Sequence, residues 1–339
     1  MKVAIVTVRA ASGEAGGAER FYEALVEAFR QAGHEAQEVP VVADESTFEQ
    51  IKRNYLTCYD LDLSAFDLVV STKAPTWLVR HQRHVCYLVH TIRVFYDMFD
   101  SVFPDAGPEL KAQRALVHQL DTKALSPPHC RGIFSIGSEV SDRLRQWNGL
   151  DAPIMHPPLW GGEFHAGPFG DYLLLPGRLH PWKRVDLVIR AMRYVSAPLR
   201  LVITGTGQAE QDLRALAAGD PRIEFRGRVS DTELVSLYAG AYAIPFTPMR
   251  EDYGYVTLEA FASGKPVITC RDSGEAAAIV RESMAGYVCP PDSKAIGEHI
   301  DLLWQDRERA AALGHAGQAW VSSLSWSDIA AHLIEISAH

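Results

Sequence analysis

Residues 242–264 read YAIPFTPMREDYGYVTLEAFASG, and this stretch decides the fold class of the chain. It opens with an apolar run, residues 242–246, that has the length of a buried β-strand. A loop containing Pro248 follows, and a helical pattern then begins near Gly254 and ends at Gly264. A strand that leads through a loop into a helix is the unit of parallel sheets with right-handed crossovers. The stretch therefore predicts an α/β fold.

The same alternation of strand and helix extends along the whole chain. In the first part, strands are expected at residues 2–8, 67–71, 84–90 and 132–137. In the second part, strands are expected at residues 172–176, 200–204, 223–226, 242–246, 266–270 and 286–289. Helical patterns include residues 109–124 and 138–147, a face with Phe21, Leu25 and Phe29, and a helix starting at the capping box of residues 230–233. We predict two Rossmann-like, doubly wound parallel sheets.

Length and composition limit what the chain can be. Its 339 residues suit two domains, and 47% hydrophobic with 22% charged residues is typical of soluble globular proteins. The net charge of −9 provides no basic footprint for nucleic acid. No apolar run reaches the ~18–20 residues that cross a bilayer. Five cysteines without a CxxC pair, and histidines without paired-ligand spacing, predict neither a disulfide framework nor a metal site in a cytoplasmic protein.

A stretch rich in proline and glycine, residues 155–170, is predicted to link two domains. The first domain is then residues 1–160 and the second residues 161–322. Open parallel sheets bind ligands beyond the carboxyl ends of their strands, so with two such sheets we expect the ligand in the cleft between them. The residues that bind it should lie just after strands.

Two charged loops of the second domain meet this condition. In residues 250–259, the first turn of a helix offers backbone N–H groups to a diphosphate, while Glu251 and Glu259 can accept hydrogen bonds from sugar hydroxyls. In residues 177–184, Arg178 and Lys183 stand five positions apart and can converge on the same diphosphate. The alternatives are an amphipathic helix with two solvated glutamates and a solvated basic loop.

Three weaker signals accompany these loops. The turn TGTG at residues 204–207 contains Gly205, and the N-terminal loop contains Gly16 and Gly17, where glycine lets the backbone approach a ligand. Each of these glycines alone is also consistent with a plain turn. His90 ends a predicted strand, where it would face the cleft, although a structural histidine is an equal interpretation.

Together these residues resemble the retaining glycosyltransferases of family 4, which have the GT-B architecture. The resemblance rests first on a Glu-x7-Glu motif (Glu251 and Glu259) and a GRL-xxx-K motif (Arg178 and Lys183). A G-x-G turn (Gly205 and Gly207), an F-x-G-x-V element (residues 225–229) and a GGAER sequence (residues 16–20) add to it. It covers nearly the whole chain and is most specific in the second domain. It also implies that a last helix, residues 323–339, crosses back to the first domain.

The resemblance implies a role for each site residue. Glu259 would bind the nucleotide ribose, Glu251 the donor sugar, and His90 the sugar close to the reacting carbon. Arg178 and Lys183 would stabilise the diphosphate leaving group. The backbone N–H groups that would assist them belong to Tyr253, Gly254, Tyr255, Val256, and Gly16 or Gly17, and the base would lie near Arg228 and Val229. The implied reaction transfers a sugar from a UDP- or GDP-linked donor to an unknown acceptor hydroxyl, without a metal or other cofactor.

The chain departs from the family pattern at two places, and some questions stay open. Arg184 follows Lys183 where the family often has glycine, and residues 253–255 read YGY where it often has FGL.

The turn at residues 272–275 could reach the donor sugar or the glutamate helix. The aromatic segment 91–105 is interpreted as packing against the core, with an acceptor pocket or a membrane contact as alternatives. Alternative functions are a nucleotide-sugar epimerase and a non-catalytic nucleotide-sugar-binding subunit. Donor base, acceptor and oligomeric state are left open.

Overall fold

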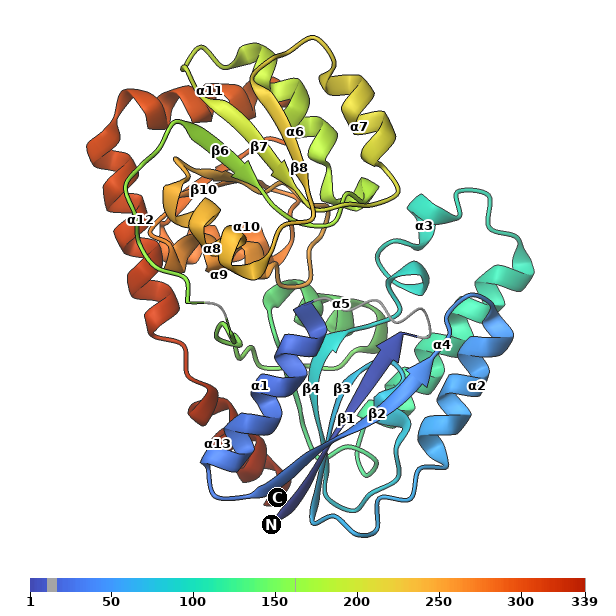
Figure 1. Ribbon diagram of the computed structural model, residues 1–339. Coiled ribbons are helices and arrows are strands. Elements are labelled where there is room, and N and C mark those ends of the chain that lie inside the picture. The colour runs from blue at the N-terminus through green and yellow to red at the C-terminus, as the bar shows by residue number, and fades with distance from the viewer. Residues whose placement is uncertain (11–16, 162, 339) are drawn as a thin grey trace. The chain divides into compact units, whose positions relative to one another are not determined.

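The computed structural model describes residues 1–10, 17–161 and 163–338 (Figure 1). Its internal contacts divide the chain into two compact units. The first comprises Met1–Trp160 and Ser325–His339, and the second Gly161–Leu324. The sequence predicted boundaries at 160/161 and 322/323, and the contacts place them at 160/161 and 324/325. Helix α13 (Trp326–Ala338) packs on helix α1 of the first unit, where the rings of Trp326 and Phe21 lie 5.7 Å apart.

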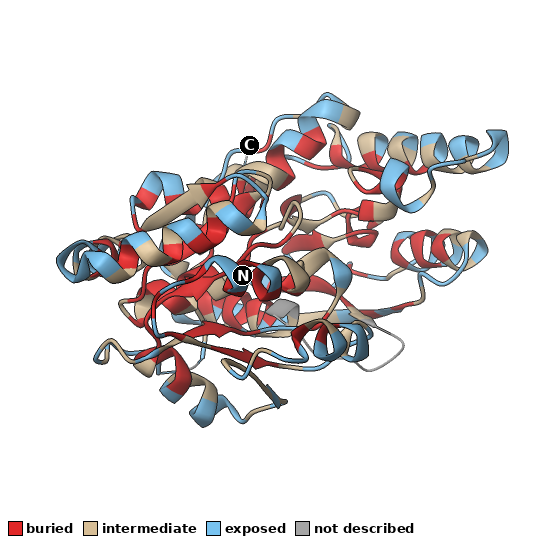
Figure 2. Ribbon diagram, turned by 90° about the horizontal axis from the view of Figure 1, so that it is seen from above, coloured by how far each residue is buried: buried red, intermediate tan, exposed pale blue. Residues whose placement is uncertain are grey.

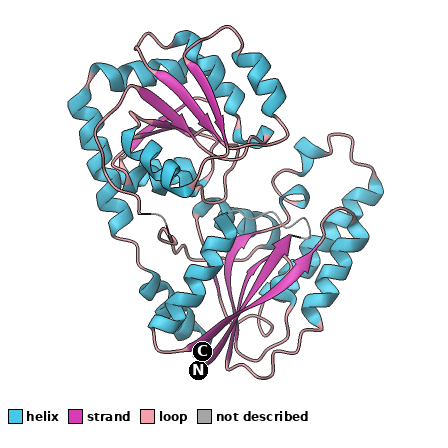
Figure 3. Ribbon diagram, in the orientation of Figure 1, coloured by secondary structure: helices cyan, strands magenta, loops and turns pink. Residues whose placement is uncertain are grey.

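The first unit contains one parallel sheet in the order β2-β1-β3-β4-β5. Its strands are β1 (Lys2–Ala10), β2 (Glu35–Ala43), β3 (Leu68–Lys73), β4 (His84–His90) and β5 (Ile133–Ser135). Its helices are α1 (Gly17–Gln31), α2 (Phe48–Tyr59), α3 (Phe99–Val102), α4 (Pro108–Leu125) and α5 (Ser138–Asn148), with 3-10 turns η1 (Thr76–Leu78) and η2 (Arg93–Phe95). The central strands are buried because helices cover both faces of a parallel sheet (Figures 2 and 3).

The sequence-based list of strands lacks β2. This strand lies at the edge of the sheet, pairs only with β1, and exposes residues such as Glu35 and Val42. Its polar and partly exposed pattern therefore does not read as a buried run.

The second unit contains two three-stranded parallel sheets, β6-β7-β8 and β9-β10-β11. Their strands are β6 (Tyr172–Leu175), β7 (Arg200–Thr204), β8 (Ile223–Gly227), β9 (Ile244–Pro245), β10 (Val267–Cys270) and β11 (Gly286–Cys289). Two backbone hydrogen bonds join β6 to the segment that leads into β9, Tyr242 N–H to Tyr172 O at 2.7 Å and Leu174 N–H to Ala243 O at 3.2 Å. The combined order is β8-β7-β6-β9-β10-β11, the doubly wound arrangement that the sequence predicts.

Strand β9 is shorter than the predicted run of residues 242–246. The residues before it, Tyr242 and Ala243, pair with β6, whereas Ile244 and Pro245 pair in register with β10. Beyond the strand, Phe246 N–H still donates to Ile268 O at 2.9 Å. The helices of this unit are α6 (Val185–Ala191), α7 (Glu210–Ala217), α8 (Asp231–Gly240), α9 (Tyr255–Ala262), α10 (Glu275–Ser283), α11 (Ser293–Gln305) and α12 (Arg307–Ser322), with η3 (Pro181–Lys183) and η4 (Met192–Tyr194). The predicted cap of α8 is confirmed, since Ser230 Oγ accepts from Glu233 N–H at 3.2 Å.

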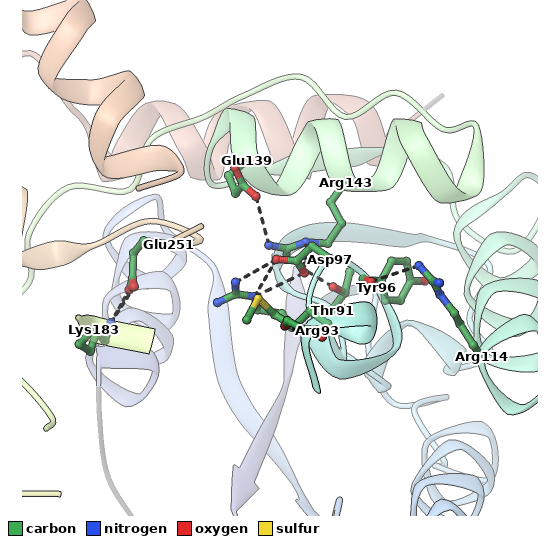
Figure 4. A network of polar contacts seen from close by, with 11 residues as sticks. Thr91, Arg93, Tyr96, Asp97, Arg114, Glu139, Arg143, Lys183 and Glu251 are labelled. Carbon is green, nitrogen blue, oxygen red and sulfur yellow. Dashed lines mark hydrogen bonds and ion pairs between the residues drawn. The ribbon is translucent and has the colours of Figure 1, made fainter. Parts of the chain in front are cut away.

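The aromatic segment 91–105 packs against the core of the first unit, as the sequence predicts. Phe95, Tyr96 and Phe99 are buried in this segment. Asp97 holds it from within through ion pairs to Arg93 and Arg143, both at 2.9 Å (Figure 4). Within the described residues, no helix combines the length and the apolar character needed to span a bilayer.

A second buried carboxylate, Asp121 of α4, gathers three donors from other elements. Its oxygens accept from Tyr55 Oη at 2.6 Å, Trp77 Nε1 at 2.8 Å and Tyr96 Oη at 2.7 Å. Burial raises the pKa of Asp121 to about 6, although these hydrogen bonds act in the opposite direction. This carboxylate thus connects α2, η1 and the aromatic segment to α4.

Replacing this carboxylate should destabilise the first unit. We expect Asp121→Ala to lower the free energy of unfolding by at least about 3 kcal/mol, because each buried donor left without an acceptor costs roughly 1–3 kcal/mol. Urea denaturation followed by fluorescence measures the change. The exposed Asp62, whose partner among the described residues is Ser64, provides the control, and Asp62→Ala should cost less than about 1 kcal/mol. Equal losses in the two variants would contradict the role of Asp121.

Candidate functional site

The candidate site lies in the second unit, where the loops after β6 and β9 leave adjacent strands. The helices that follow these two strands diverge to opposite faces of a doubly wound sheet, and ligands bind in the crevice this leaves at the carboxyl ends. The loop after β6 contains Arg178 and Lys183, and the loop after β9 contains Glu251. The strand order thus brings together the two charged loops that the sequence singled out.

An ion pair connects these two loops. Lys183 Nζ donates to both carboxylate oxygens of Glu251, each at 2.7 Å (Figure 4). The side chains are 25% and 19% exposed, so the pair is sheltered but still reaches solvent. Lys183 Nζ also lies 5.7 Å from the ring centroid of Phe246, the residue that follows β9. Neither side chain is the solvated surface group of the alternative interpretation.

Positive charge is concentrated at the end of β6. Arg178 is exposed at the start of the loop. His180 accepts the Trp182 N–H on its Nδ1 at 3.2 Å, and its pKa is lowered by burial and, in addition, by the charges of Arg178 and Lys183. The two cations on this loop, Arg178 and Lys183, are the groups that could attract an anionic ligand.

Helix α9 adds a favourable dipole to the same place. Gly254 is its N-cap, with φ +82°, and the first turn of a helix carries N–H groups without intrahelical acceptors. A Cβ at Gly254 would lie 2.9 Å from a ring carbon of Phe246, so glycine is required here by space as well as by conformation. The predicted helix start is confirmed. The hydroxyl of Tyr255, where the family often has leucine, is buried and has no hydrogen-bond partner among the described residues.

Glu259 of α9 is held by a residue that the sequence analysis missed. Tyr238 of α8 is fully buried and donates its hydroxyl to Glu259 Oε2 at 2.6 Å. Burial, with the neighbouring Glu259 charge, raises the pKa of Tyr238 well above its usual range, so the hydroxyl stays a donor. In the sequence Tyr238 is part of the apolar face of a helix, and nothing in its spacing distinguishes it from a core residue.

The turn after β10 is the third segment of the site. Glu251 N–H donates to Ser273 O at 3.2 Å, and Glu275 N–H donates to Glu251 O at 2.9 Å. Glu251 and Gly274 therefore form an isolated parallel bridge. The turn thus contacts the loop that precedes the glutamate helix, whereas the sequence-based expectation was a contact with the helix itself or with the donor sugar.

The glycines of residues 204–207 have a structural explanation. A Cβ on Gly205 would lie 2.0 Å from Gly177 O, and a Cβ on Gly207 would lie 2.4 Å from Leu179 O. Both glycines let the loop after β6 pack against the loop after β7, so no ligand is needed to explain them. Arg228 is exposed and Val229 half-buried just beyond the end of β8.

The remaining candidates belong to the first unit. His90 is the last residue of β4, is half-buried, and accepts the Ala74 N–H on its backbone oxygen at 3.0 Å. Gly17 is the first residue of α1, and Gly16 lies outside the described residues. In the described part of the chain, no group of three or more histidine, cysteine, aspartate or glutamate side chains is placed to hold a metal ion.

Comparison with known proteins agrees with this geometry. Residues 170–320 match the protein family described as Glycosyl transferases group 1, so the second unit carries a domain of that family. The sulfoquinovosyl transferase SQD2 of Arabidopsis thaliana is 26% identical over 205 residues, which are 58% of this chain and 40% of that protein. A GDP-mannose-dependent alpha-(1-6)-phosphatidylinositol monomannoside mannosyltransferase of Mycobacterium tuberculosis is 33% identical over 175 residues, 47% of this chain and 45% of that protein.

These curated relatives are matched over only about half of their own length. Among solved structures, a sucrose-phosphate synthase from Thermosynechococcus elongatus has a TM-score of 0.74 at 18% identity and covers 99% of this chain and 98% of its own. The predicted fold, two Rossmann-like doubly wound units of the GT-B type, is confirmed.

The contact between Gly274 and Glu251 leads to a stability prediction. A Cβ at Gly274 would lie 2.4 and 2.5 Å from the Glu251 backbone oxygen and nitrogen, at φ +63°. Gly219 has φ +96° with open space around its Cα, so Gly219→Ala measures the conformational cost alone. We expect Gly274→Ala to lower the free energy of unfolding by about 1–3 kcal/mol more than Gly219→Ala. If chemical denaturation gave equal losses of unfolding free energy for the two variants, the close contact between Gly274 and the Glu251 backbone would be contradicted.

Proposed function

We propose that this protein is a retaining glycosyltransferase that moves a sugar from a nucleoside-diphosphate donor to an acceptor hydroxyl. The observation that carries the proposal is the Lys183–Glu251 ion pair. It joins a cation that can bind phosphate to a carboxylate that can bind sugar hydroxyls. The pair lies at the switch point of the sheet, where the helices after β6 and β9 diverge to opposite faces. The match of residues 170–320 to Glycosyl transferases group 1 supports it.

The donor diphosphate is assigned to the positive end of the site. Lys183 and Arg178 would bind its oxygens, together with backbone N–H groups at the start of α9. These groups belong to Tyr253, Gly254, Tyr255 and Val256, and the resemblance adds those of Gly16 or Gly17. Negative charge grows on the diphosphate as the sugar leaves, and cations and N–H dipoles directed at the diphosphate stabilise that charge.

The two glutamates are assigned to hydroxyl groups on either side of the diphosphate. Glu259, oriented by Tyr238, would accept from the ribose, and Glu251 would accept from the donor sugar. The base would lie near Arg228 and Val229. We also assign to His90 a contact with the sugar close to the reacting carbon, on the basis of the resemblance. Both UDP- and GDP-linked donors are compatible with these groups.

The reaction needs no protein nucleophile in this scheme. The bond between the anomeric carbon and the diphosphate oxygen breaks, and a bond from the acceptor oxygen forms on the same face of the sugar. The acceptor proton passes to an oxygen of the leaving phosphate. The protein's part is to bind the donor, orient it and stabilise the departing charge.

Removing either cation or Glu251 should slow the reaction. We expect Arg178→Ala, Lys183→Ala and Glu251→Ala each to reduce release of nucleoside diphosphate from the donor by about 10²–10³-fold, the usual cost of one lost electrostatic stabiliser. A thermal-shift screen of UDP, GDP and their sugars first identifies the donor, because a bound ligand raises the melting temperature.

The matched controls come from an exposed ion pair on α11. Lys294 and Glu298 are 67% and 58% exposed and lie 3.7 Å apart. Lys294→Ala and Glu298→Ala should leave the release rate within twofold of wild type. Wild-type rates in all three site variants would contradict the proposal. Binding without release, whatever acceptor is offered, would indicate the non-catalytic alternative, and interconversion of donor sugars would indicate an epimerase.

We also propose that the cations, and not a metal ion, neutralise the leaving group. Activity should then be unchanged after treatment with EDTA and dialysis, since Lys183 and Arg178 are part of the chain. The assay is release of nucleoside diphosphate before and after chelation. A loss of activity that added Mg²⁺ or Mn²⁺ restores would show that the charge is neutralised in another way.

A further inference from the structure

The structure assigns a positioning role to Arg184, and this inference rests on the function proposed above. Its guanidinium holds the loop after β9 and the turn after β10 against the loop after β6. It thereby fixes the distance and orientation between Lys183 and Glu251, the groups assigned to the diphosphate and the sugar. Arg184 itself is not assigned a contact with the donor.

The contacts of the guanidinium reach two separate segments. Nε donates to Thr247 O at 2.8 Å and Nη2 to Pro248 O at 2.7 Å, in the loop after β9. Nη1 and Nη2 donate to the two carboxylate oxygens of Asp272 at 2.8 and 2.7 Å, in the turn after β10. The bidentate pair with Asp272 is the strong, planar form of an arginine ion pair. The Arg184 side chain is only 13% exposed, whereas its partner Asp272 is 42% exposed, so the guanidinium is largely buried and the carboxylate still meets solvent.

The backbone of Arg184 shows that the side chain is held in place at a cost. The residue has φ +49° and ψ +42°, a left-handed conformation that costs a residue with a Cβ about 1 kcal/mol or more. Glycine takes this conformation without that cost, and glycine is what the family often has at this position. An arginine persists here because its side-chain contacts compensate for the backbone conformation.

The two segments that Arg184 contacts also hold the backbone of Glu251 in place. Asp272 O accepts from Arg250 N–H at 2.9 Å, and Ser273 O accepts from Glu251 N–H at 3.2 Å. On the other side, Thr247 and Pro248 lie a few residues before Glu251 in the same loop. Lys183 is the chain neighbour of Arg184. One guanidinium therefore sets the geometry of both partners of the ion pair.

A lysine at position 184 could not make all of these contacts. A lysine ammonium is a point charge and lacks the planar fork that reaches Asp272 and two carbonyl oxygens at once. We therefore expect Arg184→Lys to lower kcat for release of nucleoside diphosphate at least tenfold. Arg184→Gly should lose as much, although it removes the backbone cost. Binding of the nucleoside alone, whose ribose is assigned to Glu259 and whose base is assigned to the region near Arg228, should change less than twofold in calorimetry.

The matched control is Arg200→Lys. Arg200 starts β7, at the opposite end of the sheet, and pairs with Asp171 at 3.0 Å and Glu224 at 3.3 Å. This variant should keep wild-type kcat and donor KM. All assays are run well below the melting temperature of each variant, so that a purely structural role would lower the melting temperature and leave kcat and KM unchanged.

A double variant tests whether Arg184 acts through its ion pair with Asp272. If Arg184 acts through Asp272, Asp272→Asn should lower kcat, and adding it to Arg184→Lys should cause little further loss. An Arg184→Lys protein with wild-type kcat and donor KM would overturn the role of Arg184 while leaving the proposed function intact. Wild-type protein that binds neither nucleotide nor nucleotide sugar would overturn the proposed function and this role with it.

Discussion

The backbone pairing of β6 with the segment entering β9 is the constraint on which the rest of the site depends. Tyr242 N–H bonds to Tyr172 O at 2.7 Å, and this bond joins two three-stranded sheets into one doubly wound arrangement. The loops that leave these strands are then neighbours, and Lys183 meets Glu251 across 68 positions of sequence. The Lys183–Glu251 pair is partly exposed and keeps part of its hydration. Either side chain can therefore give up the other for a ligand group without leaving an unpaired buried charge.

The same arrangement would let a chain with a net charge of −9 hold the anionic donor of the proposed function. The relevant charge is local: Arg178 and Lys183 stand at the end of β6, and the first turn of α9 directs its dipole to the same unit's switch point. Burial, and in addition the charges of Arg178 and Lys183, lowers the pKa of His180 in the same loop. Glu251 offsets part of that charge until a ligand binds.

The sequence predicted the elements well where an apolar run is mostly buried, as in β4, β7 and β10. It missed β2, an edge strand with exposed polar positions. Its predicted run 242–246 is longer than β9, because Tyr242 and Ala243 pair with β6 whereas Ile244 and Pro245 pair in register with β10. The charged loops were predicted as sites because both follow strands. Their direct pairing could not be predicted, since it depends on which strands are adjacent. Tyr238 and Arg184 were not identified as site residues, because one looks like a core residue and the other like a solvated base.

In the proposed function, the switch point of the second unit binds a nucleoside diphosphate through Lys183 and Arg178. The decisive measurement is a crystal structure of the protein with the diphosphate that the thermal-shift screen identifies. We expect phosphate oxygens within hydrogen-bonding distance of Lys183 Nζ, the Arg178 guanidinium and the first turn of α9, with the ribose at Glu259. A diphosphate bound elsewhere, with the Lys183–Glu251 pair undisturbed, would contradict it.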